Sequence, residues 1–180
     1  SMYAEDGLTM SYDEARLWTT VVAMSGGHIL LNEQIDKLNA ERLELARQIM
    51  PPLGTAARPF DFFEYPYCTE AYIPFVDNIP NENVFYTKEK LLDNGAVLCA
   101  VYNWEEEESS KTIDVAKYFR KEINYDFIAI NAWTKECIHM DKGILELILR
   151  PRSCEVFLLR PLKEGFLYSD NSFYLGMNRE

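Results

Sequence analysis

The residues that could do metal or redox chemistry are few in this sequence, and their spacing does not suit a metal site. His28 and His139 are the only histidines, and neither has a ligand partner at HxxxH spacing. The four cysteines include no CxxC pair; they are Cys68, Cys99, Cys137 and Cys154. Zinc sites require several such ligands at short, regular spacing. The sequence therefore predicts no metal site, and nothing in it indicates a cofactor.

The cysteine spacing also bears on localisation. Two disulfides could form in an oxidising compartment, but nothing in the spacing demands them. Free thiols in a reducing cytosol are the favoured interpretation. Residues 1–2 (SM) have the form of a tag remnant before a start codon, so a native signal could have been removed. Localisation stays open, with the cytoplasm favoured. No membrane span is expected, because no run approaches the roughly 18 apolar residues that a membrane-spanning helix needs.

Acidic residues form the one dense cluster of potentially functional side chains. Four consecutive glutamates occupy residues 105–108, followed by two serines. They could bind a cation, but a polar run between two strand-like segments is typical of a solvated hairpin tip. The net charge is −11, without any cluster of Lys or Arg. Because phosphate binding needs concentrated positive charge, nucleic-acid binding is excluded, whereas neutral sugars remain compatible.

The first third of the chain is expected to be helical. Ser11 and Glu14 fit a capping box, and the residues that follow are apolar on more than one side of a helix. A diglycine ends this segment, and residues 28–31 form a short apolar run of strand length. Asn39 can cap a second helix, which Pro51 and Pro52 stop.

Beyond about residue 59, short β-branched and aromatic segments alternate with turn residues, which indicates an antiparallel sandwich. The expected strands lie at 84–86, 96–103, 111–115, 127–133, 144–149 and 154–160, with a last hairpin within 166–175. Residues 93–95 (DNG) and 141–143 (DKG) supply turns. Side-chain alternation places Val97, Cys99 and Val101 on one face of the second strand, opposite Leu98, Ala100 and Tyr102. Trp104 and Trp133 are expected to be substantially buried at strand ends.

The helical part resembles the clan-D glycoside hydrolases, the melibiase or α-galactosidase group. The resemblance rests on residues 14–18 (EARLW), 23–27 (AMSGG) and 29–32 (ILLN). They are similar to the penultimate barrel helix, the eighth barrel strand and the loop after it. Residues 38–42 (LNAER) resemble the start of the last barrel helix, and residues 51–54 (PPLG) and 57–61 (ARPFD) resemble the linker that follows.

The second half resembles the C-terminal antiparallel domain of the same family. Residues 101–104 (VYNW) are similar to a strand whose Asn-Trp precedes a polar hairpin. Residues 132–136 (AWTKE) resemble the family's Trp-Thr-x-Glu turn, and 156–159 (VFLL) resemble the closing strand. The likeness covers roughly residues 8–162.

The resemblance implies a retaining hydrolysis whose two carboxylates this chain does not contain. Such a pair must stand about 5–5.5 Å apart, one as nucleophile and one as acid/base. Asp6 reads as a turn residue and Asp13 as a helix-start residue, so neither matches and no catalytic residue is assigned. His28 would lie at the beginning of the eighth strand, where a packed or capping role is favoured. Asn32 and Glu33 would lie nearer its catalytic end and are the candidate substrate-binding residues.

An aromatic run follows the linker, at Phe60, Phe62, Phe63, Tyr65 and Tyr67. Flat rings could stack on sugars, but an anchor between the sandwich and the barrel is the favoured interpretation.

The predicted fold class is therefore α+β, with residues 1–58 a helical remnant of a (β/α)8 barrel and residues 59–180 an antiparallel β-sandwich. The expected function is that of the C-terminal part of an α-galactosidase-like retaining enzyme acting on terminal α-linked sugars, the part itself being inactive. The alternative is a free-standing carbohydrate-binding or structural β-sandwich. Exposure of four large side chains of the first helix would cost several kcal/mol. A homodimer through residues 12–50 is therefore expected as well.

Overall fold

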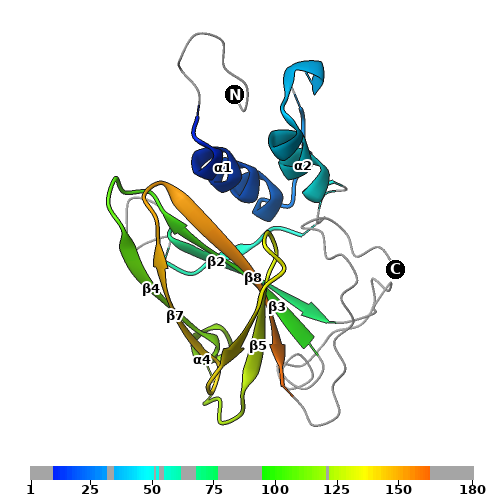
Figure 1. Ribbon diagram of the computed structural model, residues 1–180. Helices are drawn as coiled ribbons and strands as arrows, with labels where there is room; N and C mark the ends of the chain where they lie inside the picture. The colour runs from blue at the N-terminus through cyan, green and yellow to red at the C-terminus, as the bar shows by residue number, and fades with distance from the viewer. Residues whose placement is uncertain are drawn as a thin grey trace.

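The computed structural model describes residues 10–31, 35–50, 52, 55–61, 68–76, 95–120 and 122–162. Its helical layer lies over an antiparallel β-sandwich (Figure 1). The helical elements are α1 (Tyr12–Met24), the 3-10 turn η1 (Ile35–Lys37), α2 (Ala40–Gln48) and, within the sandwich, the short α4 (Val115–Phe119). The described residues include no helix of the length and apolarity that a bilayer crossing requires.

Both helix starts follow the sequence prediction. The Ser11 hydroxyl accepts from the Glu14 amide at 3.1 Å, and the Glu14 carboxylate accepts from the Ser11 amide at 2.8 Å, which completes the capping box. The Asn39 side chain accepts from the Arg42 amide at 2.9 Å and begins α2.

The sandwich consists of a six-stranded and a two-stranded sheet. The larger sheet has the order β1-β2-β3-β8-β5-β6 and the smaller one pairs β4 with β7, all pairs being antiparallel. The bounds are β1 Arg58–Pro59, β2 Glu70–Val76, β3 Gly95–Asn103, β4 Ser109–Asp114, β5 Phe127–Asn131, β6 Cys137–Met140, β7 Ile144–Leu149 and β8 Ser153–Pro161.

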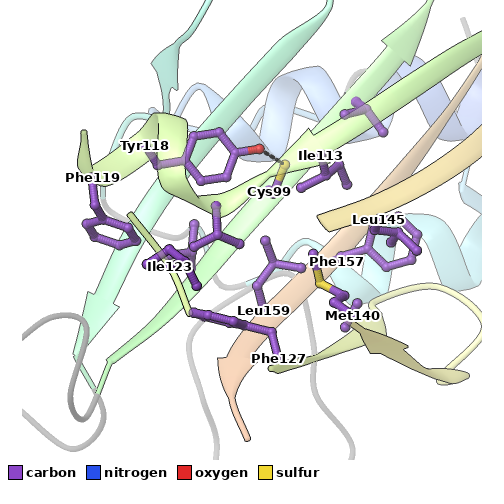
Figure 2. Packing of buried hydrophobic residues seen from close by; sticks show 14 of the residues in the cluster. Cys99, Ile113, Tyr118, Phe119, Ile123, Phe127, Met140, Leu145, Phe157 and Leu159 are labelled. Carbon is purple, nitrogen blue, oxygen red and sulfur yellow. Dashed lines mark hydrogen bonds between the residues drawn. The ribbon is translucent and has the colours of Figure 1, made fainter. Parts of the chain in front are cut away.

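Strand β3 separates two hydrophobic cores, as its alternation predicts. Val97, Cys99 and Val101 belong to the core between the two sheets, part of which Figure 2 shows around Phe127 and Leu159. The opposite face of β3 carries the other three side chains into a second core, between the larger sheet and the helices; they are Leu98, Ala100 and Tyr102. Because both faces are covered, β3 reads as a nearly continuous apolar strand.

Helix α1 covers the outer face of the larger sheet, above β8 (Figure 1). Leu17, Ala23 and Met24 enter the second core, and α2 adds Ile49. Trp104 and Trp133 are partly buried against the same core at the ends of β3 and β5, so neither side chain stands free in solvent. Their side chains thus close the second core at two strand ends.

Four sequence expectations differ from the structure or lie outside its described part. Residues 28–31 form no strand, because no strand lies beside them in the described part to pair their backbone groups; Leu30 is 89% exposed. Val115, expected at a strand end, instead begins α4, whose first turn the Asp114 carboxylate caps at the Ala116 amide. The strand at 84–86 and the hairpin within 166–175 lie outside the described residues.

The turn at residues 141–143 joins β6 to β7 as the sequence predicts. Lys142 and Gly143 have φ values of 48° and 74°, and the Ile144 amide donates to the Asp141 carbonyl at 3.0 Å. Two successive positive φ angles are those of a tight two-residue turn, which the isolated Asp141–Ile144 bridge closes; here the turn leads from the larger sheet to the smaller one.

Candidate functional site

The candidate substrate-binding residues Asn32 and Glu33 lie outside the described residues. His28, next to that segment, is exposed rather than packed against a core. Asp6 also lies outside the described part, and Asp13 accepts from the Arg150 guanidinium at 2.7 Å in a surface ion pair. Asp13 therefore serves at the start of α1, as its position in the capping box predicts.

The acidic run is solvent-exposed, as expected, but it forms no hairpin tip: it is a loop that leads from β3 in the larger sheet to β4 in the smaller sheet, and these two strands do not pair. Glu106 pairs with the Arg152 guanidinium, which also contacts Glu14 of α1 at 3.4 Å. The hydrogen bond from Arg152 lowers the pKa of Glu106. A carboxylate held in its ionised form is poorly suited to protonate a leaving group, so Glu106 has a structural role. Among the described residues, no group of three or more His, Cys, Asp and Glu side chains could hold a metal ion.

A buried ion pair fastens α1 to the sandwich. Arg16 is 6% exposed, and its Nη2 donates to the Cys154 carbonyl and to Glu155 Oε1, each at 2.8 Å. The other oxygen of Glu155 accepts from Asn131 Nδ2 at 2.7 Å. The helix, β8 and the end of β5 are therefore linked through one carboxylate. Burial is the largest single influence and would lower the pKa of Arg16, but the charges of Glu155, Cys154 and Asp13 and the hydrogen bond to Glu155 together outweigh it, so the pKa is raised.

Asn103 of the Asn-Trp motif joins the β3–β4 loop to the β7–β8 loop, both of which connect the two sheets. It is 2% exposed, and its Nδ2 donates to the carbonyls of Glu107, Leu149 and Arg150 at 2.7, 3.3 and 2.9 Å. Its Oδ1 accepts from the Glu105 amide at 3.1 Å. An apolar residue could not replace these contacts, because the carbonyls of Glu107, Leu149 and Arg150, the second of them buried, would lose their side-chain donor.

The second motif, at residues 131–136, forms the turn between β5 and β6. Asn131 Oδ1 accepts from the amides of Trp133 and Thr134 at 2.9 and 3.0 Å. Lys135 takes a φ of 66°, and its amide donates to the Asn131 carbonyl at 2.9 Å. Both asparagines thus shape loops at the same end of the sandwich where Arg16 attaches the helix.

Asp61, which follows Phe60 of the aromatic run, binds the residues at the start of β2. Its carboxylate accepts from the Thr69 and Glu70 amides at 2.9–3.0 Å and from the Thr69 hydroxyl. Burial alone would raise the pKa of Asp61, but these hydrogen bonds outweigh it and lower the pKa. Of the aromatic run, only Phe60 lies in the described residues; its ring packs edge-on against Tyr118 at 6.0 Å, which is an anchoring contact.

The four cysteines are free thiols, and two of them are buried. Cys154 donates to the Thr20 hydroxyl at 3.3 Å, and burial raises the pKa of its thiol to about 12. A thiol with so high a pKa is a poor nucleophile at neutral pH. Cys154 therefore contributes packing between α1 and β8.

Sequence reasoning missed the Arg16–Glu155–Asn131 network. A signal for it was present, because Arg16 stands among the residues that face the sheet, and arginine is seldom buried without a partner. The partner could not be named from sequence, since Glu155 is 139 positions away. Taken together, the polar side chains in this part of the chain join helix α1, the loops between the two sheets and the sandwich.

The fold of this chain is similar to that of parts of solved glycoside hydrolases. A β-L-arabinopyranosidase of glycoside hydrolase family 27 from Geobacillus stearothermophilus matches 90% of this chain with a TM-score of 0.63 and 17% identity. α-Galactosidase I from Mortierella vinacea matches 86% with a TM-score of 0.60 and 11% identity. The α-galactosidase from Saccharomyces cerevisiae matches 86% with a TM-score of 0.58 and 11% identity. No protein-family model and no curated protein sequence matches the chain.

The comparisons define the fold class. The chain has the α+β, largely antiparallel fold of a part of these enzymes, in agreement with the resemblance in the sequence. It spans 34%, 37% and 44% of the three solved chains, respectively.

Proposed function

We propose that this chain is the C-terminal portion of a retaining glycoside hydrolase that acts on terminal α-linked sugars, with α-galactosides first among them. In this proposal α1, α2 and the segment between them end a (β/α)8 barrel within residues 1–58, and residues 59–180 form the sandwich that supports it. The observation that carries the proposal is the match of one continuous arrangement, helices and sandwich together, over most of this chain and about a third of each glycosidase.

The proposed role of the chain is mechanical support. The contacts of Arg16 with Cys154 and Glu155 of β8 hold α1 at a fixed place on the larger sheet. Catalytic groups held on barrel strands need such a rigid base, because displacements of about 1 Å can cost about a hundredfold in rate. The substrate-binding assignment of Asn32 and Glu33 belongs to the same proposal, since these residues follow α1 along the chain.

A chimera tests the proposal. The part of the Geobacillus arabinopyranosidase that matches this chain is replaced by residues 10–162, and hydrolysis of an aryl β-L-arabinopyranoside is measured. We expect the chimera to fold and to retain measurable turnover. The matched control carries Arg16→Ala, which should lower its melting temperature. A chimera that folds with the Arg16 contacts intact but has no turnover would contradict a supporting role.

The alternative, a free-standing carbohydrate-binding sandwich, is favoured by one feature. Trp18 is 50% exposed and its ring meets that of Trp104 edge-on at 5.6 Å, so an indole is held partly open to solvent. Carbohydrate affinity of the 180-residue chain that is lost on Trp18→Ala would favour this alternative over the enzyme portion.

Self-association through residues 12–50 stays a proposal, on a smaller surface than the sequence suggests. The sandwich of the same chain covers part of α1, so Met24 is 3% exposed, while Trp18 and Val22 remain 50% and 40% exposed. Sedimentation of the wild-type chain and of Trp18→Glu/Val22→Glu decides the point. We expect a dimer that the double substitution dissociates; a wild type that is monomeric at all concentrations would exclude it.

A further inference from the structure

Helices α1 and α2 lie side by side and run in the same direction (Figure 1). Near their N-terminal ends, the Arg42 guanidinium of α2 donates to the Met10 carbonyl, which precedes α1. Near their C-terminal ends, Met24 of α1 and Ile49, which follows the last turn of α2, enter the same hydrophobic core. Consecutive helices of a (β/α)8 barrel have this relation, because a strand returns between them. The N-terminal ends of such helices all lie at the face that carries the active site.

Two loops of the sandwich reach the N-terminal end of α1. In the β7–β8 loop, Arg150 Nη2 donates to Asp13 Oδ1 at 2.7 Å, and Arg152 Nη1 donates to Glu14 Oε1 at 3.4 Å. Arg152 also pairs with Glu106 of the β3–β4 loop. Asp13 and Glu14 belong to the first turn of α1. Two arginines of one loop therefore hold the start of the helix.

The backbone of the β7–β8 loop is itself fixed, so the two guanidinium groups extend from a rigid base. The Arg150 carbonyl accepts from the buried Asn103 side chain at 2.9 Å and from the Ser153 hydroxyl at 2.7 Å. The Arg152 amide donates to the Glu105 carbonyl at 2.9 Å, which joins the β7–β8 loop to the β3–β4 loop. The position of the first turn of α1 thus follows the position of these two loops.

The effect of these ion pairs is local. The side chains of Arg150 and Arg152 are 62% and 51% exposed, and exposed ion pairs contribute little to the free energy of unfolding because water and salt screen them. The buried pair of Arg16 with Glu155 already fastens α1 to β8. What Arg150 and Arg152 add is the placement of the end at which the chain enters α1.

We propose that Arg150 and Arg152 are positioning residues for the active-site face of the parent enzyme, where they hold the loop that leads into α1. This inference rests on the proposed function, in which α1 is a barrel helix. Barrel active sites are built from the loops that connect each strand to the next helix, and such a loop ends where the helix begins. A loop of the sandwich therefore influences substrate binding without touching the substrate.

Steady-state kinetics of the Geobacillus chimera, with the neutral aryl β-L-arabinopyranoside, test the proposal. The double substitution Arg150→Ala/Arg152→Ala should raise KM about fivefold and leave kcat within about twofold, because it displaces a binding loop and not the catalytic carboxylates. The melting temperature should change little, since both pairs are exposed. Arg150→Lys/Arg152→Lys keeps both charges and should recover part of the lost affinity.

Arg47→Ala is the matched control. Arg47 is also an exposed arginine in an ion pair, with Glu44 at 3.8 Å, but it lies in the last turn of α2, at the opposite end of the helices. This variant should keep the wild-type KM. Raising NaCl to about 1 M should raise the KM of the wild-type chimera and leave that of the double alanine variant unchanged, because the substrate has no charge for salt to screen.

The outcomes separate the inference from the proposed function. A wild-type chimera that folds but has no turnover contradicts the proposed function and this inference with it. If the wild-type chimera has turnover, an unchanged KM in the double alanine variant overturns the inference alone. A KM that rises equally in Arg47→Ala also overturns it, because the effect would then not depend on the N-terminal end of α1.

Discussion

Replacement of Arg16 by alanine is expected to lower the free energy of unfolding by about 3 kcal/mol, the scale for breaking a buried, hydrogen-bonded ion pair. The substitution removes both hydrogen bonds of Arg16 Nη2 at once, so the Cys154 carbonyl and one oxygen of Glu155 lose their partner between α1 and β8. It also leaves the Glu155 carboxylate, whose side chain is 24% exposed, without its cation. Denaturant unfolding followed by fluorescence and by circular dichroism measures the change.

The chain offers a matched control in Arg150. Its guanidinium also joins the sandwich to α1, by a 2.7 Å bond to Asp13, but the arginine side chain is 62% exposed. Arg150→Ala should therefore cost about 0–1 kcal/mol. The double variant Arg16→Met/Glu155→Gln should recover part of the loss, because Gln still accepts from Asn131 and no unpaired charge remains. Equal effects of Arg16→Ala and Arg150→Ala would contradict the role given to the buried pair.

A second large effect is expected at Gly26, where α1 ends. Gly26 has a φ of 67°, and a Cβ at this position would collide with the backbone of Thr55 and Ala56. The two segments are further joined by the Ala57 amide, which donates to the Met24 carbonyl at 2.7 Å. Because backbone rather than a flexible side chain must move, Gly26→Ala should cost about 3 kcal/mol or more, the sum of strain at a positive φ and local overpacking.

Gly27 is the control for this position. A Cβ there has no heavy atom within 4 Å, and its φ is not in the left-handed region. Gly27→Ala should therefore change the free energy of unfolding by about 1 kcal/mol or less. The expected direction is stabilising, because alanine reduces the conformational entropy of the unfolded chain. Thermal unfolding of the two variants side by side measures the difference. A Gly26→Ala variant as stable as Gly27→Ala would mean that the end of α1 does not lie against residues 55–57.

Sequence reasoning predicts well the features that depend on neighbours along the chain. The capping box at Ser11, the cap at Asn39 and the turn at residues 141–143 need only a few consecutive residues, and all three are present in the structure. The faces of β3 follow from period-two alternation and are confirmed as well. Long-range features are predicted only through the family resemblance.

The misses have physical reasons of their own. Strand β2 was not predicted because it contains Pro74, and proline is rare in central strands. In the structure β1 pairs only with Ala71 and Tyr72 of β2, so at Pro74 the strand has β3 as its one neighbour. Strand β6 has four residues, too few for a periodic signal. The strand expected at 28–31 needs a parallel neighbour that the described chain does not supply. The Arg16 network depends on a partner 139 positions away, which no local pattern encodes.

The most direct test of the central claim is the hydrolytic activity of the 180-residue chain alone. Initial rates with an aryl α-galactoside are measured on repurified protein and compared with buffer. We expect no turnover above background, because Asp13 is engaged with Arg150 at the start of α1 and the retaining mechanism requires a nucleophile and an acid/base about 5–5.5 Å apart. Turnover that survives repurification and is lost on Asp6→Asn or Asp13→Asn would contradict the claim that this chain supports a catalytic centre built by other residues.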